Sequence, residues 1–145
     1  MAERPSVPDM WKRQSSLAEL NKMAEGTLIA GLGMVFTRLE ADWLEATMPM
    51  DARTQQPFGL LHGGASVALA ESLGSMAGWL CSQPGQNVVG IEVSASHLRA
   101  VYSGTVRGIC RALHRGSLNQ VWQIEIVNGQ DQLCCMARLT TAIIG

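Results

Sequence analysis

The sequence has no uninterrupted apolar stretch long enough to span a membrane, and its first residues contain no apolar signal core. A spanning helix needs about 18 consecutive apolar residues, whereas one glutamate and three serines interrupt the most apolar segment, 65–81. Charged residues make up only 16% of the chain, and the net charge is −1. The chain therefore has no overall electrostatic field that would attract nucleic acid or an anionic membrane. We expect a cytoplasmic protein that binds neither.

Several common catalytic and cofactor motifs are also missing. The four cysteines form no C-x-x-C pair, and the three histidines have no zinc-ligand spacing relative to them. There is no G-x-S-x-G elbow for a serine nucleophile, no Walker motif and no dinucleotide-binding glycine motif. We therefore expect free, mostly buried thiols, no metal and no resident cofactor.

The length of 145 residues fits one domain. Residues 1–14 are polar and contain two prolines, so we predict a poorly ordered N-terminal segment before a domain over 15–145. A capping box at Ser16–Glu19 predicts a short amphipathic helix that stops near Gly26. Apolar periodicity and turn signals then predict strands at 32–39 and 44–50, a helix at 64–81, and strands at 88–102, 105–113, 120–127 and 133–143.

The order of these elements indicates an α+β fold. The last four expected strands follow one another through short turns, which favours an antiparallel sheet with the helix packed on one face. The helix is unusually rich in glycine and alanine, and small residues allow a sheet to approach a helix backbone closely. We therefore predict a central helix wrapped by an antiparallel sheet.

The start of this helix carries hydrogen-bond donors. His62-Gly63-Gly64 leads into it, and glycine amides at a helix N-terminus can hold an anion or a developing oxyanion. His62 could orient a water or a carbonyl group, or it could simply cap the helix. Gln56, in the preceding loop, could bind the reacting oxygen, although loop glutamines are usually solvated.

One carboxylate, Glu71, stands among the small residues of the helix. Its face of the helix is formed mostly by small side chains, which leave a groove beside it, and Ser75 at i+4 can hydrogen-bond to it or to a water. A structural ion pair with an arginine such as Arg138 is the alternative. Because His62 and Glu71 are nine residues apart, they are separated by about 13 Å of helix rise and half a turn. They cannot serve one small reacting group within one chain, so either their roles are unrelated or the site lies between two copies.

A possible phosphate site lies in the second half of the chain. His97 and Arg99 are two residues apart on an expected strand and therefore share a face. The turn 114–117 offers His114, the Gly116 amide and the Ser117 hydroxyl. An exposed polar strand end explains these residues equally well.

Taken together, the segment QQPFGLLHGGASVALAESLGS, with LEATMPMDARTQQPFGLLHGG, VVGIEV, QVWQIEI and RLTTAI, resembles the hotdog-fold acyl-CoA thioesterases over nearly the whole chain from Trp11. The resemblance is strongest to the bacterial branch that acts on 1,4-dihydroxy-2-naphthoyl-CoA or on aryl thioesters in enterobactin synthesis. It implies dimers that associate as tetramers, with Glu71 as nucleophile or general base and Gly63 as oxyanion donor. It also implies that Gln56 and His62 bind near the thioester, that Ser75 places the water, and that coenzyme A contacts Gly90, His97, Arg99, His114, Gly116 and Ser117.

This resemblance leads us to expect hydrolysis of acyl-CoA thioesters, with aromatic acyl groups favoured. Two alternatives stay open at this stage. The enzyme could instead act on acyl or aryl groups attached to a carrier protein. The chain could also be a non-catalytic acyl-CoA-binding module, but the presence of all the expected catalytic residues disfavours this alternative.

Overall fold

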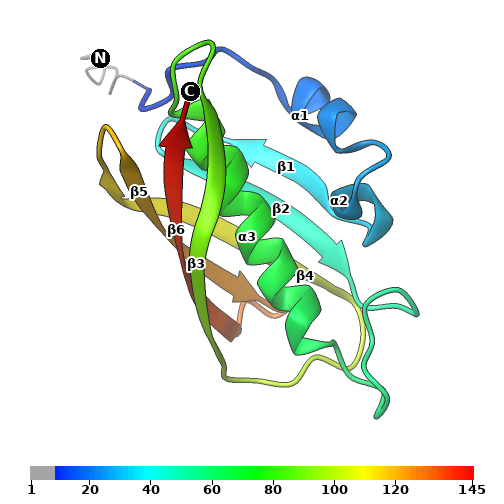
Figure 1. Cartoon of the computed structure of the whole chain (residues 1–145). Coiled ribbons are helices and arrows are strands. Elements are labelled where there is room, and N and C mark those ends of the chain that lie inside the picture. The colour runs from blue at the N-terminus through cyan, green and yellow to red at the C-terminus, as the bar shows by residue number, and fades with distance from the viewer. Residues whose placement is uncertain (1–8) are drawn as a thin grey trace, which may run out of the picture.

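The computed structural model describes residues 9–145 and contains one six-stranded antiparallel sheet with a long helix lying against it (Figure 1). The strand order is β1-β2-β4-β5-β6-β3. This confirms the predicted α+β architecture. The elements are α1 (Leu17–Ala24), α2 (Leu28–Gly31), β1 (Val35–Leu39), β2 (Trp43–Pro49), α3 (Gly63–Leu80), β3 (Asn87–His97), β4 (Thr105–Arg115), β5 (Asn119–Val127) and β6 (Leu133–Ile144).

The core lies between α3 and the concave face of the sheet. Alternation on β5 places Trp122, Ile124 and Ile126 on this face, and all three are completely buried. Glycine brings the helix close: a Cβ on Gly74 would collide with the Leu139 side chain of β6. The small residues predicted for this helix are therefore required where its backbone meets the sheet.

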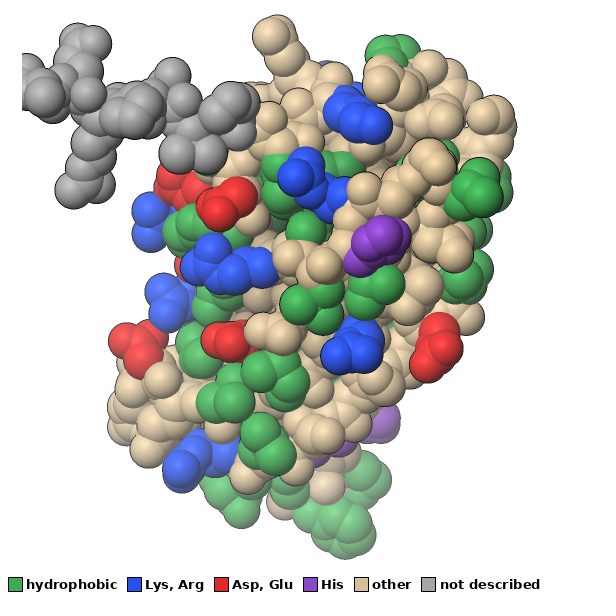
Figure 2. Space-filling model, turned by 90° about the vertical axis from the view of Figure 1, so that its left-hand side faces the viewer, with side chains coloured by type: hydrophobic (Ala, Val, Ile, Leu, Met, Phe, Trp, Pro, Cys, Tyr) green, Lys and Arg blue, Asp and Glu red, His purple; other side chains and the backbone are tan. Residues whose placement is uncertain are grey.

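The opposite face of the sheet is of mixed character and carries charges of both signs. Viewed from the side of β5 and β6, basic, acidic and apolar side chains are interspersed (Figure 2). Arg107 on β4 pairs with Asp131 at 2.7 Å and lies 3.6 Å from the buried carboxylate of Glu45 on β2. This face has the character of a solvated sheet surface rather than of a second core.

Two elements differ from the sequence-based prediction. The strand expected at 88–102 ends at His97, because the Cys134 carbonyl accepts hydrogen bonds from both Leu98 N and Arg99 N and the chain leaves the sheet. Residues 28–31 form the short helix α2 where no element was predicted, capped by the Thr27 hydroxyl. Four residues are too few to show helical periodicity in a sequence.

The N-terminal segment is partly docked on the domain. Of the stretch 1–14 predicted to be poorly ordered, residues 1–8 lie outside the described residues. In the remainder, Trp11 Nε1 donates to Glu40 O at 2.6 Å, and the backbone N–H groups of Lys12 and Arg13 both donate to Leu80 O. Composition alone does not reveal which residues of a polar segment find such partners. The poor order of the segment stays a prediction.

The strand β3 forms one edge of the sheet. It is 11 residues long, and its partner among the described elements is β6, on one side only. Val89 and Ile91 on this strand are 43% and 58% exposed. A long edge strand with exposed apolar residues is available for pairing with another chain.

None of the helices found within residues 9–145 combines the length and apolar character needed to cross a bilayer.

Candidate active site

The N-terminus of α3 presents backbone donors. His62 is the N-cap, and its Nδ1 accepts a hydrogen bond from Gly64 N at 2.8 Å. This contact fixes Nε2 as the protonated nitrogen of the neutral ring. The Gly63 N–H has no acceptor among the described residues 9–145 and is one of the free donors at the positive end of the helix dipole.

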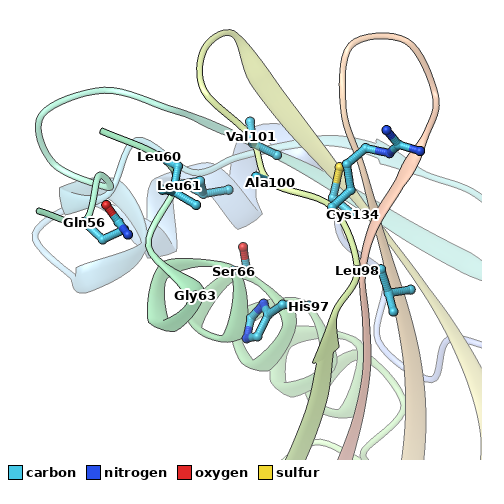
Figure 3. A pocket seen from close by; sticks show the side chains of 11 residues that line it. Gln56, Leu60, Leu61, Gly63, Ser66, His97, Leu98, Ala100, Val101 and Cys134 are labelled. Atoms are coloured by element: carbon cyan, nitrogen blue, oxygen red, sulfur yellow. The ribbon is translucent and has the colours of Figure 1, made fainter. Parts of the chain in front are cut away.

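A pocket of about 310 Å³, here called the donor pocket, adjoins this helix start. Figure 3 shows Gly63, Ser66 and His97 on one side and Leu60, Leu61 and Val101 on the other. A Cβ on Gly63 would lie 3.1 Å from His97 Nε2, so the imidazole packs directly against the glycine. The pocket therefore combines backbone and side-chain donors. Its lining consists of Gln56, Leu60, Leu61, Gly63, Ser66, His97, Leu98, Arg99, Ala100, Val101 and Cys134.

Gln56 is held in this pocket by its own loop. Its backbone N–H donates to Leu60 O at 2.8 Å, and its side-chain Oε1 accepts from Phe58 N. Since the amide oxygen is engaged, the amide NH₂ group is the part of the side chain that remains to donate. Gln56 is therefore equipped to donate to an oxygen in the pocket.

Glu71 lies in a different cavity of about 450 Å³. We call it the acyl groove, after the acyl group that the resemblance leads us to expect beside Glu71. The carboxylate is exposed, and no hydrogen bond or ion pair involving it is found among residues 9–145. A Cβ on Gly90 would lie 2.7 Å from Glu71 Oε1, so the carboxylate rests on the bare backbone of β3. The rest of the groove is mostly apolar, and its lining consists of Met23, Leu28, Ile29, Ala68, Glu71, Ser72, Ser75, Met76, Trp79 and Val88.

The alternative in which Arg138 neutralises Glu71 does not fit this geometry. The neighbours of Arg138 on β6, Ala137 and Leu139, are buried toward α3, so alternation places the arginine on the opposite face of the sheet. It lines a shallow hollow there with Ser94 and Gln123. Among residues 9–145, Glu71 is thus a carboxylate without a structural cation.

The donor pocket and the acyl groove share no lining residue. Gly63 and Glu71 are both on α3, separated by about 12 Å of helix rise. The structure brings Gln56, Gly63, His97 and Arg99 together at the donor pocket. It brings Glu71 and Ser75 together beside Gly90. It does not bring these two sets together within one chain.

The remaining residues expected to contact coenzyme A lie elsewhere. His114 is on the last part of β4, and Gly116 and Ser117 form the turn to β5. A Cβ on Gly116 would lie 2.8 Å from His114 Nε2, so the ring folds over the turn. Arg115 donates to Met10 O, which also accepts from Cys81 Sγ just beyond α3, so this turn lies at the C-terminal end of the helix. His97 and Arg99 lie at its N-terminal end.

Sequence reasoning missed most of the apolar lining. Met23 and Leu28 reach the acyl groove from α1 and α2 although they are 47% and 64% exposed, and Trp79 reaches it from the last turn of α3. Only the helical spacing of Trp79 from Glu71, eight residues, could have placed it on the same face.

The cysteines supply no nucleophile. All four are free and buried, as predicted. Burial raises the pKa of the Cys134 thiol, which lines the donor pocket, so its reactive thiolate is scarce at neutral pH. Within residues 9–145, no cluster of three or more His, Cys, Asp or Glu side chains could hold a metal ion.

Comparison with known proteins identifies the family. The model of the thioesterase superfamily matches residues 58–135. The chain is 56% identical, over 93% of its length and 99% of the relative, to 1,4-dihydroxy-2-naphthoyl-CoA hydrolase from Escherichia coli. It is 58% identical to the proofreading thioesterase EntH from Klebsiella pneumoniae, over 93% of this chain and 98% of the relative.

Solved structures agree with this assignment. The crystal structure of a Haemophilus influenzae thioesterase, HI1161, superposes with a TM-score of 0.92 at 46% identity, covering 94% of this chain and 95% of that one. A thioesterase from Pseudomonas aeruginosa, PA1618, gives the same TM-score at 44% identity, covering 94% and 99%. The chain therefore belongs to the thioesterase superfamily, has the hotdog fold, and is a thioester hydrolase.

Proposed function

We propose that this enzyme hydrolyses acyl-CoA thioesters, preferring aromatic acyl groups, at sites shared between two subunits. The observation that carries the proposal is the Glu71 carboxylate, which has no partner among residues 9–145 and lines a mostly apolar groove, on the same helix as the Gly63 donor but in a separate cavity. The E. coli relative named above hydrolyses an aromatic CoA thioester. An apolar groove of about 450 Å³ has room for an aromatic ring.

The β3 edge supplies a way to join the two half-sites. Gly90 touches Glu71, and His97 touches Gly63, so both half-sites rest on this strand. If β3 pairs antiparallel with its own copy about an axis between Val93 and Ser94, Gly90 lies opposite His97 of the partner subunit, about 5 Å away between Cα atoms. This pairing places Glu71 of one subunit beside the donor pocket of the other, and each dimer has two such sites.

Hydrolysis then requires only the residues present. The thioester carbonyl oxygen accepts hydrogen bonds from the partner's Gly63 N–H and Gln56 amide, which stabilise negative charge as the tetrahedral intermediate forms. Glu71 either attacks the carbonyl carbon, giving an anhydride that water opens, or takes a proton from the attacking water. In both routes the carbon–sulfur bond breaks, coenzyme A leaves as its thiolate, and the acyl group leaves as the free acid. Ser75, one helical turn from Glu71, can hold the water.

The same pairing assembles a coenzyme A site from two chains. Because the helices of the two subunits run in opposite directions, the turn containing His114, Gly116 and Ser117 approaches the partner's His97 and Arg99. Imidazole and guanidinium donors with turn amides suit the phosphates of coenzyme A. Association of two such dimers into a tetramer stays a prediction.

Replacement of Glu71 tests this function. Glu71→Gln keeps the size of the side chain and removes its charge, so benzoyl-CoA turnover should fall by about 10³-fold or more, as expected for loss of a catalytic base or nucleophile. Circular dichroism should be unchanged, because Glu71 has no hydrogen-bond or ion-pair partner among residues 9–145. Near-normal turnover by Glu71→Gln would exclude the proposed role.

A panel of substrates tests the preference. Rates with benzoyl-CoA, aliphatic acyl-CoAs and the same acyl groups on a carrier protein should rank benzoyl-CoA first. A higher kcat/KM for the carrier-protein thioesters would instead favour the alternative substrate class.

A further inference from the structure

The C-terminal end of α3 is held by a residue from outside the helix. No basic residue lies in the last turn of α3 itself. Arg13 supplies the charge instead: its Nε donates to Trp79 O at 3.0 Å, and its Nη2 donates to Gln83 O at 2.8 Å and Gln86 O at 2.9 Å. A guanidinium at this position satisfies carbonyl groups that a helix end leaves free, and it complements the negative end of the helix dipole.

The same guanidinium also orients an aromatic side chain. Arg13 Cζ lies 4.4 Å from the centroid of the Trp79 ring, which is stacking distance. Arg13 therefore contacts both the backbone and the ring of Trp79. Because backbone carbonyls hold the guanidinium in place, the indole that stacks on it has less freedom to change rotamer.

Trp79 is in turn part of the acyl groove. It lines the groove together with Glu71, Ser75 and Met76, all on α3. Eight residues separate Glu71 from Trp79, so their Cα atoms are about 12 Å apart along the helix axis. An acyl group whose thioester carbon lies at Glu71 and which extends along α3 meets this ring.

We propose that Arg13 is a positioning residue that fixes Trp79 as the end wall of the acyl groove and thereby limits the length of the acyl group. The inference rests on the proposed function, since it takes Glu71 as the reacting end of the groove. It adds a specificity determinant, Arg13, that lies outside the lining of the donor pocket and of the acyl groove. The wall favours a compact aromatic acyl group over a long aliphatic one, because a fixed indole stacks on a ring but blocks a chain.

The chain contains a matched control for this pair. Arg38 stacks over Trp43 on the sheet, with Cζ 4.8 Å from the ring centroid, and neither residue lines the acyl groove. Arg38→Ala therefore removes an arginine–tryptophan stack of the same kind without changing the groove.

The experiment compares binding of two non-hydrolysable thioethers, S-benzyl-CoA and S-decyl-CoA, to the full-length protein by calorimetry. Trp79→Ala should improve the ratio of S-decyl to S-benzyl affinity by about tenfold, the effect of burying about two more methylene groups. Arg13→Ala should shift the ratio in the same direction by about threefold, because the ring stays but is free to move. Arg13→Lys keeps the charge but loses the planar stack, so it should also shift the ratio. This variant replaces Arg13→Ala in the experiment if Arg13→Ala folds poorly. Arg38→Ala should leave the ratio unchanged.

The outcomes separate this inference from the proposed function. An unchanged ratio in Trp79→Ala, or equal shifts in Arg13→Ala and Arg38→Ala, would overturn the positioning role even if Glu71→Gln abolishes turnover. A shifted ratio together with normal turnover by Glu71→Gln would support the groove and reject the catalytic assignment. If neither thioether binds, the groove is not an acyl site and the inference is wrong.

Discussion

Mixing two inactive variants tests whether each active site is shared between subunits. Glu71→Gln removes the carboxylate, and Gly63→Pro removes the N–H at the first helical position, where proline is otherwise well tolerated. The added ring would lie close to His97, so the fold of this variant needs checking by circular dichroism. Each homodimer carries its defect in both sites and should be nearly inactive.

Random association of the two variants produces about half mixed dimers. In a mixed dimer, one site contains both defects and the other contains Glu71 from one chain and Gly63 from its partner, with neither defect. One of two sites is therefore intact in half of the dimers, and the mixture should show about one quarter of the wild-type activity. Sites contained within single chains would give no recovery at all.

The assay is release of coenzyme A from benzoyl-CoA after the variants are co-expressed, with mixed dimers quantified by native mass spectrometry. The matched control is co-expression of Glu71→Gln with Glu71→Ala, which should recover nothing because every site lacks the carboxylate. Mixed dimers without activity in the Glu71→Gln and Gly63→Pro mixture would refute the shared-site argument.

Two further predictions concern the core. Gly74→Ala places a methyl group against Leu139 and should destabilise the protein by about 1–3 kcal/mol in urea unfolding. Gly129→Ala, where nothing lies within 4 Å of the added Cβ, should change stability by less than about 0.5 kcal/mol, and equal effects would contradict the close packing of α3 on β6. Because burial raises the pKa of the Cys110 thiol, iodoacetamide at pH 8 should leave this cysteine unmodified in the native protein and alkylate it after unfolding. Mass spectrometry of the digested protein measures this, and rapid alkylation of native Cys110 would contradict its burial.

Much of the fold could be predicted from local patterns. The alternation around Trp122 and the small residues of α3 are direct consequences of burial, so the sequence displays them. The end of β3 at His97 could not be predicted, because it depends on the Cys134 carbonyl, a partner far away in sequence. The same holds for Arg13, whose role depends on contacts with residues 66 to 73 positions away.

Part of the candidate site could be predicted from the sequence, because helix geometry is regular. Helix rise alone separates His62 from Glu71, so counting residues shows that the two cannot meet around one small reacting group within a chain. The acyl groove has no such signature, since Met23, Leu28 and Trp79 come from three different helices and share no spacing. Apolar residues near a helix look the same in a sequence whether they face a core or a ligand.

The exposed edge of β3 has a consequence for how substitutions act. In a strand that pairs with its own copy, every contact occurs twice, once on each side of the symmetry axis. A substitution such as Val89→Thr that weakens each contact by about 0.7 kcal/mol therefore weakens association by about 1.4 kcal/mol, a tenfold change in the dimer Kd. Because the proposed dimer is what joins the two half-sites, specific activity at low protein concentration would change with the dimer Kd. In the proposed dimer, small sequence changes on this edge would therefore shift the protein concentration at which the enzyme is active.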